Sequence, residues 1–382
     1  MPRYRADLFA VVPSSGRFEA ARNLPDARCQ EFGQGIAALG DDNVPYPANT
    51  DRGFAMVRTV TDFVFATCLP DMEPALKREV ARTRPELRFA YSRPGLVTFK
   101  SDRAVTPEDV TGSAFARVWG RSIGPARDPA DAAHQLAYVG ANRVHVFARD
   151  PEGVVDLESW REAIASATGI PAGSALPGEL VADVIVAPGE PAWLGLHRHG
   201  SGGAAEPGGA IAVEVPAEAP SRAYAKIEEA IAWGTLPVEA GQVALEIGAA
   251  PGGAVLALAR RGVTVWGVDT GDLAPAVLAQ PNVHHLQIKV GALRWEQLPA
   301  RIDWLLVDVN LAPQVALHEI ARLMPKLRPT LRGAVFTLKL NDWSFVDELP
   351  ALGDRIIALG FASVRFKHLP SNRREVCAIA RS

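Results

Sequence analysis

The stretch VALEIGAAPGGAVLALARRGVTVWGVD, residues 243–269, decides the fold. It begins with an apolar run that suits a buried parallel strand, and a glycine-rich turn over residues 248–253 follows. An apolar helical run then ends at two arginines and Gly262, and a second apolar strand ends on Asp269. This order of strand, turn, helix, strand and acid predicts the first half of a doubly wound α/β sheet.

The glycine-rich turn also indicates what kind of ligand it would hold. It reads E-I-G-A-A-P-G-G over residues 246–253, so an acid lies in the first strand beside it. That acid would repel a phosphate and suits a ligand with a cationic amine, and Asp269 is placed to accept hydrogen bonds from both hydroxyls of a ribose. S-adenosylmethionine has the amine and the ribose and lacks a phosphate. On these residues alone, an ordinary glycine-rich loop remains the alternative.

The length and charge of the chain limit which architectures and partners are possible. A chain of 382 residues predicts two or three domains, and 48% apolar with 22% charged residues is typical of globular proteins. The net charge is −3, which excludes a globally basic nucleic-acid binder. Residues 216–382 carry 18 Lys/Arg and 16 Asp/Glu, whereas the other 215 residues carry 22 and 27. Any contact with RNA must therefore use local patches.

The cysteines and the apolar runs indicate the compartment. Cys29, Cys68 and Cys377 lie far apart, which argues against a disulfide framework and fits a reducing cytoplasm. The first residues lack a signal-peptide core, and no apolar run is long enough to span a membrane. The eight histidines show no metal-ligand spacing. We expect a cytoplasmic protein with no membrane segment and no metal; the oligomeric state is left open.

The first half of the chain divides into two regions. Residues 1–60 predict an irregular extension with at most a short strand near residues 9–12. Residues 61–215 predict a small α+β region without a βαβ rhythm. The expected strands are 63–67, 96–99, 143–147, 181–186 and 191–196, the expected helices are 73–83 and 157–167, with another starting near 107–109, and 199–210 is a glycine-rich linker.

The second half, residues 216–382, continues the α/β rhythm. A helix is expected over residues 222–231, with Ser221 as its N-cap and Lys226 off its apolar face, where a lysine is usually solvated. Further strands are predicted at 283–286, 304–307, 333–338, 361–366 and 374–380, the last antiparallel to its hairpin neighbour, with helices at 315–327 and 345–359.

Charged residues follow three of these strands directly. Asp269, Asp308 and Lys339 each come after the last apolar residue of a strand, so all three are expected at the rim where open α/β sheets bind ligands. A lysine at this rim can act as a general base if burial and a neighbouring cation lower its pKa. Lys226 is the candidate neighbour, and Asp308 with Glu375 would hold the two ammonium groups.

These residues together resemble the FtsJ-type family of RNA ribose 2'-O-methyltransferases. That family carries D-x-G-A-A-P-G-G in its cofactor turn and a Lys–Asp–Lys–Glu tetrad. The turn is similar to residues 246–253, with Glu in place of Asp. The tetrad matches in order and context, at A-K-I-E-E-A, L-L-V-D, T-L-K-L and R-R-E-V. The resemblance covers about 320 residues, strongly from 216 onwards, and the matching tetrad residues are Lys226, Asp308, Lys339 and Glu375.

The resemblance implies a Rossmann-like S-adenosylmethionine-dependent methyltransferase domain at residues 216–382 that transfers methyl to a ribose 2'-hydroxyl of RNA. Lys339 would be the base, Lys226 would lower its pKa, Asp308 would orient Lys339 and Glu375 would hold Lys226. Glu246 would face the methionine amine and Asp269 the adenosine ribose. The implied cofactor-binding residues are Glu246, Gly248, Ala249, Ala250, Pro251, Gly252, Gly253, Asp269, Val290 and Asp308.

Two further segments narrow the resemblance. PAEAPSRAYAKIEEA at 216–230 and AFARVWG at 114–120 are similar to members that modify a 23S rRNA cytidine and carry a THUMP-type RNA-binding module, which would correspond to residues 61–215. Two positions depart from the family. Ala254 stands where an aromatic residue often follows the Gly-Gly, and Lys289-Val290-Gly291 stand where an acid is expected near the adenine.

Two other functions fit parts of the pattern. One is a non-catalytic RNA-binding or ribosome-assembly protein that keeps the methyltransferase fold, which would bind no cofactor. The other is a small-molecule O-methyltransferase, against which the long N-terminal region and a two-lysine centre both argue, because two lysines suit a weakly acidic alcohol.

Overall fold

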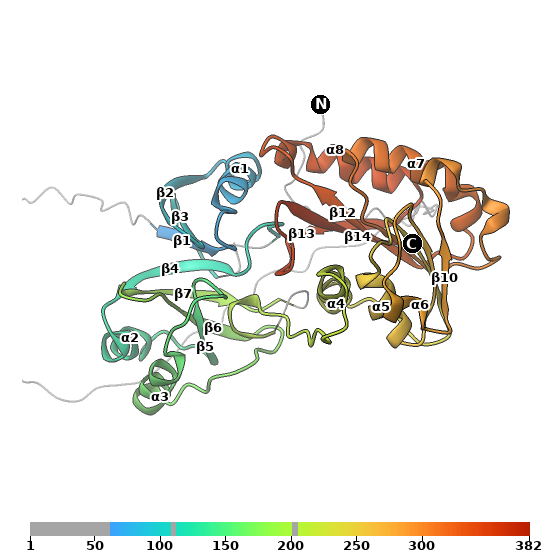
Figure 1. Cartoon of the computed structure of the whole chain (residues 1–382). Coiled ribbons are helices and arrows are strands. Elements are labelled where there is room, and N and C mark those ends of the chain that lie inside the picture. The colour runs from blue at the N-terminus through green and yellow to red at the C-terminus, as the bar shows by residue number, and fades with distance from the viewer. Residues whose placement is uncertain (1–61, 108–111, 201–204) are drawn as a thin grey trace, which may run out of the picture. The chain divides into compact units, whose positions relative to one another are not determined.

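The computed structural model describes residues 62–107, 112–200 and 205–382, and these form two seven-stranded sheets with their helices (Figure 1). The sheet nearer the N-terminus has the order β2-β3-β1-β4-β7-β6-β5, and the other has the order β10-β9-β8-β11-β12-β14-β13. The strand expected near residues 9–12, the 1–60 extension and the helix expected from 107–109 lie partly or wholly outside the described residues. None of the described helices has both the length and the apolarity needed to cross a membrane.

The second sheet confirms the predicted Rossmann-like α/β architecture. Strands β10, β9, β8, β11 and β12 are parallel in that order, while β14 is antiparallel to both β12 and β13, as expected for the last strand. The chain order reverses between β8 and β11, the switch point where such sheets bind ligands. The strands are β8 (Val243–Ile247), β9 (Thr264–Val268), β10 (Val283–Leu286), β11 (Trp304–Val307), β12 (Gly333–Lys339), β13 (Ser363–Lys367) and β14 (Glu375–Arg381).

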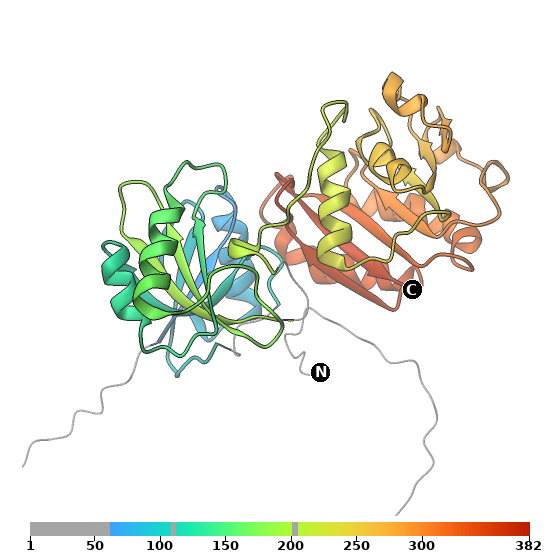
Figure 2. The ribbon, with the colours of Figure 1, turned by 90° about the horizontal axis from the view of Figure 1, so that it is seen from below.

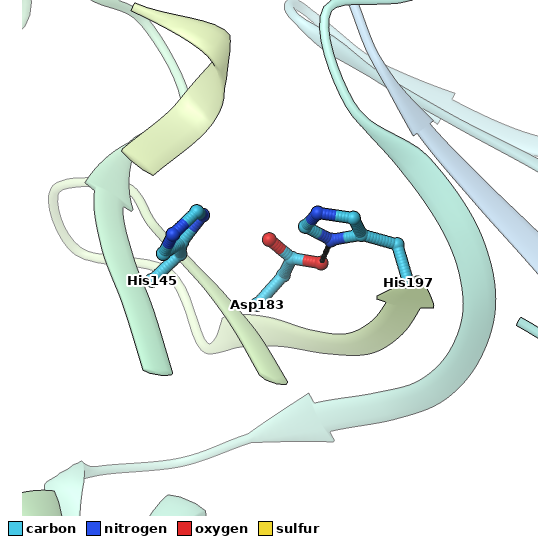
Figure 3. A group of neighbouring side chains, drawn as sticks. All are labelled: His145, Asp183 and His197. Atoms are coloured by element: carbon cyan, nitrogen blue, oxygen red, sulfur yellow. Dashed lines mark hydrogen bonds and ion pairs between the residues drawn. The ribbon is translucent and has the colours of Figure 1, made fainter. Parts of the chain in front are cut away.

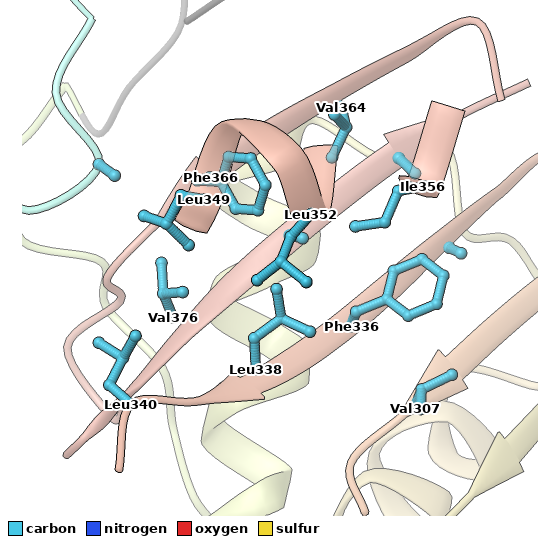
Figure 4. Close-up of a cluster of buried hydrophobic side chains, with 14 of the residues drawn as sticks. Val307, Phe336, Leu338, Leu340, Leu349, Leu352, Ile356, Val364, Phe366 and Val376 are labelled. Carbon is cyan, nitrogen blue, oxygen red and sulfur yellow. The ribbon is translucent and has the colours of Figure 1, made fainter. Parts of the chain in front are cut away.

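Helices cover both faces of this sheet, because its strands are apolar on both sides. One face packs against α7 (Pro313–Leu327) and α8 (Phe345–Ala358), where Phe336 and Leu338 of β12 meet Leu352 of α8 (Figure 4). The other face packs against α4 (Ala223–Gly234) and α5 (Gly253–Arg260) (Figure 2). Burying one large apolar side chain stabilises the folded state by roughly 1.5–3 kcal/mol. The many buried side chains of the two clusters together hold the strands in their observed register. The short α6 (Pro275–Leu278) precedes β10, and the single turns η2 (Val290–Ala292) and η3 (Trp295–Gln297) follow it.

The first sheet is mostly antiparallel but contains one parallel pair. Strands β5 (Arg143–Ala148) and β6 (Leu180–Val186) are parallel and joined through α3 (Leu157–Thr168), a single βαβ unit in a region expected to lack a βαβ rhythm. The other elements are β1 (Asp62–Thr67), α1 (Glu73–Thr83), β2 (Leu87–Arg93), β3 (Leu96–Ser101), β4 (Trp119–Ala126), α2 (Pro129–Leu136) and β7 (Ala192–Arg198), with the turn η1 (Pro207–Gly209) after them.

Three of these elements were not predicted, for physical reasons. The edge strand β2 is largely exposed, so it lacks an apolar run. Strand β4 carries Gly120, Gly124 and Pro125, and its ladder is irregular between Ser122 and Gly124. Helix α2 is only eight residues long, which makes its pattern hard to detect. The sequence does contain a start signal, Asp128 followed by Pro129, and in the structure the Asp128 side chain accepts a hydrogen bond from Asp131 N.

Helix α4 begins one residue later than its predicted cap implied. Arg222 occupies the N-cap position and makes no side-chain cap bond, while Ser221 Oγ accepts only a long bond, 3.4 Å, from Ala223 N. Tyr224 N donates to the Ser221 carbonyl, and this first turn lies close to Gly253 at the start of α5.

Candidate active site

The glycine-rich turn between β8 and α5 touches the end of strand β11. Gly248 has φ +90°, and a Cβ there would lie 2.2 Å from the Asp308 backbone oxygen. Gly252, the N-cap of α5, has φ +106°. Only glycine adopts this left-handed region without strain and leaves room for such an approach. The turn is therefore packed directly against the residue that follows β11.

Gly253 has a different reason for being glycine. A Cβ at this position would lie 2.3 Å from Ser221 Oγ and 2.8 Å from Tyr224 N. The first turn of α4 thus rests on the first residue of α5, and this contact carries Lys226 toward the switch point of the sheet. The second glycine of the pair serves helix packing as well as ligand approach.

Glu246 is the last residue but one of β8 and is 2% exposed. Its Oε2 has no hydrogen-bond partner among the described residues, although the side chain lines one small cavity with Lys226 and Asp308. Burial, followed by the charges of Asp308 and Asp269, raises the pKa of Glu246 well above its ordinary value. A buried carboxyl with one oxygen still unpartnered fits a ligand ammonium group, because a cation beside it would offset the loss of water.

Asp269 fixes the glycine-rich turn from the end of β9. Its Oδ2 accepts from Ala250 N at 3.0 Å, and its Oδ1 accepts from Gly271 N at 2.9 Å. Each carboxylate oxygen keeps a further lone pair, so both can still accept from ribose hydroxyls. Val290 opens the η2 turn after β10, and its carbonyl accepts from Arg322 Nη2 at 2.7 Å.

Strand alternation delivers three charged side chains to the α4 face of the sheet. Val335 and Thr337 of β12 face α4, and Lys339 continues this period of two. Across the antiparallel ladder, Lys339 is directly opposite Glu375, and Cys377 follows on the same face. Asp308 follows Val307 at the end of β11. The three side chains therefore meet below α4, which supplies Lys226.

The four residues form a closed ring of alternating charges. Lys339 Nζ donates to Asp308 Oδ1 at 2.8 Å and to Glu375 Oε2 at 2.7 Å. Lys226 Nζ donates to Asp308 Oδ2 at 3.1 Å and pairs closely with Glu375 Oε1. The side chains are 7% to 22% exposed, so solvent screens these pairs only partly. The structure brings together all four residues that the sequence nominated.

Two details differ from the sequence-based expectation. Each acid holds both lysines, rather than one lysine each. Burial by itself lowers the pKa of Lys339, but its hydrogen bonds and charges with Asp308 and Glu375 outweigh burial, and the net shift is upward. The predicted lowering of this pKa by Lys226 is therefore not found, because two carboxylates balance the two ammonium groups.

One supporting residue was missed from the sequence. Glu229 is buried on α4, and its carboxylate accepts from Ser371 N at 2.8 Å and from Ser371 Oγ at 2.7 Å. This contact joins α4 to the segment that leads into Glu375, and thereby fixes the distance between Lys226 and Glu375. The signal in the sequence was an acid one turn after Lys226, which reads equally well as a solvated helix charge.

Sequence comparison gives the site a family context. No family model matches the chain. It is 35% identical over 181 residues to ribosomal RNA large subunit methyltransferase M of Chromohalobacter salexigens, a match that covers 44% of this chain and 49% of that protein. It is 36% identical over 180 residues to the protein of the same name from Halorhodospira halophila, covering 46% and 51%.

Solved structures show looser likeness. The fibrillarin pre-rRNA processing protein of Methanococcus jannaschii matches with a TM-score of 0.33 and 11% identity, covering 53% of this chain and 89% of that chain. Magnesium protoporphyrin IX methyltransferase from Synechocystis matches with a TM-score of 0.31 and 15% identity, covering 42% and 84%. The chain spans about half the length of the curated relatives it matches, and over that part it is related in sequence to the ribosomal RNA large subunit methyltransferase M proteins.

Proposed function

We propose that the protein is an S-adenosylmethionine-dependent RNA 2'-O-ribose methyltransferase whose substrate is a cytidine of 23S rRNA. The observation that carries this proposal is the closed ring of two lysines and two acids beside a glycine-rich turn at the switch point of the sheet. The names of the sequence relatives support a large-subunit ribosomal RNA as the substrate. These residues build a site for an alcohol, because a ribose hydroxyl needs both alignment and proton removal.

The cofactor would be held by residues whose bonding capacity is still open. The unpartnered Oε2 of Glu246 would receive the ammonium group, and Asp269 would receive the ribose hydroxyls. The backbone from Gly248 to Gly253 leaves room for close approach. Bound S-adenosylmethionine supplies an activated methyl group on a sulfonium.

The protein's own groups would then align the hydroxyl and take its proton. Lys339 Nζ is the proton acceptor in this proposal, and Lys226 donates a hydrogen bond that positions the 2'-oxygen. The bonds to Asp308 and Glu375 raise the pKa of Lys339, so this lysine is protonated at neutral pH. A cationic ligand beside the ring would repel a protonated Lys339. It would therefore lower the pKa of Lys339 and favour the neutral, basic amine.

Cationic and aromatic side chains near the ring supply a local surface for RNA. Arg373 and Arg374 directly precede Glu375 of the ring, and the Arg374 guanidinium lies 5.2 Å from the Trp343 ring centre. Arginines bind phosphates and an aromatic ring stacks on a base, so this combination suits a single-stranded segment. We further propose that residues 61–215 form a THUMP-like RNA-binding region ahead of a methyltransferase domain at residues 216–382.

The test is methyl transfer from labelled S-adenosylmethionine to 23S rRNA of a strain that lacks the gene, followed by mapping of the 2'-O-methyl group. We expect one modified cytidine that is methylated in the wild-type strain and unmodified in the deletion strain. Cofactor binding without any transfer would favour the non-catalytic alternative. Transfer to free nucleosides or metabolites, with none to rRNA, would favour a small-molecule methyltransferase.

Glu246 allows a sharper test of the cofactor site. Its folded-state pKa is raised, so above about pH 4.5 the unfolded chain releases a proton that the folded chain retains, and the free energy of unfolding falls as pH rises. Glu246→Gln removes this penalty and also the partner of the ligand amine. We expect the variant to be at least as stable as wild type at pH 7, with the gain shrinking toward pH 4.

Chemical denaturation across pH measures the stability of Glu246→Gln, and calorimetry measures its affinity for S-adenosylmethionine, which should fall by about tenfold or more because a charge-assisted hydrogen bond is lost. Glu296→Gln, an exposed acid on η3, is the matched control and should alter neither property. Unchanged affinity in Glu246→Gln would contradict its assignment to the amine.

A further inference from the structure

Three polar side chains meet on one face of the first sheet, far in sequence from the proposed catalytic ring. They are His145 on β5, Asp183 on β6 and His197 on β7, three neighbouring strands of the sheet (Figure 3). His145 is the register partner of Asp183, and Asp183 is opposite Gly195, two residues before His197 on the same face. The strand order therefore places the three side chains in a row.

This row is buried. His145 is 1% exposed, Asp183 0% and His197 9%. The residues that alternate with them, such as Val144 and Val184, face the apolar cluster under α2 and α3, so the row lies on the opposite face of the sheet. Three polar groups side by side in a protein interior need partners, because each has lost its water.

Their partners are incomplete among the described residues. His197 Nδ1 lies 2.5 Å from Asp183 Oδ2. In the part of the chain that the structure describes, Asp183 Oδ1 has no hydrogen-bond partner, and neither ring nitrogen of His145 bonds to a side chain of the row. Burial lowers the pKa of His145 to about 4, although the Gly173 backbone lies close enough to this ring to favour its protonated form. Figure 3 shows the Asp183 carboxylate between the two imidazole rings. In a hydrogen-bonded His–Asp–His network Asp183 would bond both rings, whereas here it bonds only His197.

We propose that His145, Asp183 and His197 bind a divalent transition-metal ion, with zinc as the fitting member of that class. Two imidazoles and one carboxylate are a donor set that zinc uses, and they leave one tetrahedral position for water. One donor atom from each residue lies within 4.8 Å of the other two. Ligands around zinc are about 3.3 Å apart at bond lengths of about 2.0–2.1 Å, so ring rotations close the remaining gap.

The role that follows from the position is structural. The ion would tie three adjacent strands together on the face that α2 and α3 leave uncovered, and would satisfy the buried atoms that lack partners. A metal bound only by the folded chain stabilises that fold in proportion to its affinity. The proposal is independent of methyl transfer, because the catalytic ring is built from other residues.

The test uses the full-length, untagged chain, since a histidine tag would itself bind metal. Zinc content after gel filtration is measured by plasma mass spectrometry, and affinity by competition with a chromophoric chelator. We expect one zinc ion per chain in wild type and less than about a tenth of that in Asp183→Asn and His197→Gln, because each loses a ligand. His318→Gln, at an exposed histidine on α7, is the matched control and should retain the ion.

A second measurement does not depend on any variant folding. Wild-type protein treated with a chelator should melt at a lower temperature, and zinc or cobalt should restore the original melting temperature, whereas magnesium, which prefers oxygen ligands, should not. Bound cobalt should show the visible absorption of a four-coordinate site. Wild type that holds no more zinc than Asp183→Asn, or that gains no thermal stability from added zinc, would overturn the proposal.

Discussion

Lys339→Ala is expected to lower the rate of methyl transfer to RNA by about a hundredfold or more, the usual scale for loss of a general base. The truncation removes Nζ, which bonds both Asp308 and Glu375, and it leaves the glycine-rich turn after β8, on the other side of β11, unchanged. Single-turnover kinetics at saturating S-adenosylmethionine measure the chemical step, and calorimetry should find cofactor affinity within about twofold of wild type.

The control for this experiment is Lys326→Ala, at the last turn of α7 and outside the charge ring. It should keep the wild-type rate. A Lys339→Ala enzyme that transfers methyl at an undiminished rate would refute the assignment of Lys339 as the base. A pH–rate profile separates the roles further, because in wild type the rate should rise with pH as Lys339 loses its proton, and the variant should lack this limb.

Glu375→Gln should produce the largest loss of stability among conservative changes in the ring. Glu375 is 7% exposed and pairs with both lysines, so its neutralisation leaves two ammonium groups facing one acid. Removal of one partner from a buried ion pair costs about 3 kcal/mol or more. Urea unfolding at pH 7 measures the change, and the exposed pair between Glu218 and Arg260 gives the comparison, since Glu218→Gln should cost about 1 kcal/mol or less.

This loss should depend on pH in a defined direction. The folded-state pKa of Lys339 is raised above its ordinary value of 10.5, so its ionic stabilisation is complete below pH 10.5 and disappears as pH rises through the folded-state value. The difference in unfolding free energy between wild type and Glu375→Gln should therefore be constant near neutrality and narrow at strongly alkaline pH. A difference that widens there would exclude the proposed charge pairing.

The sequence predicts the second half of the chain, residues 216–382, well because its signals are local. The apolar run before Gly248, the Gly-Gly pair and the charged residues after β11 and β12 each report a position at one rim of a parallel sheet. The sequence gives weaker support for placing Lys226 in the ring, since a helix lysine is usually solvated. The packing of α4 against Gly253 is what brings this lysine to the site. The direction of the Lys339 pKa shift depends on which acid reaches which amine, and strand order alone does not fix that.

The first half is harder to read because its decisive contacts are non-local. His145, Asp183 and His197 come from three strands separated by 38 and 14 residues, and no spacing rule joins them. Only the pairing of β5, β6 and β7 brings these residues together. The expectation of a protein without a metal site was based on spacing in the sequence, which does not report such pairing. The edge strand β2 was not predicted for a local reason: it is exposed and lacks the apolar pattern of a buried strand.

The pairing of β14 with both β12 and β13 has a consequence for the order of events during synthesis. Strand β14 inserts between two strands that precede it in the chain, and its first residue is Glu375. A nascent chain that has emerged only as far as β13 holds Lys226, Asp308 and Lys339 but lacks the acid that joins the two amines. The charge ring can therefore form only after β14 has paired with β12 and β13. A ribosome-bound, unfinished chain has the glycine-rich turn before it has the complete charge ring.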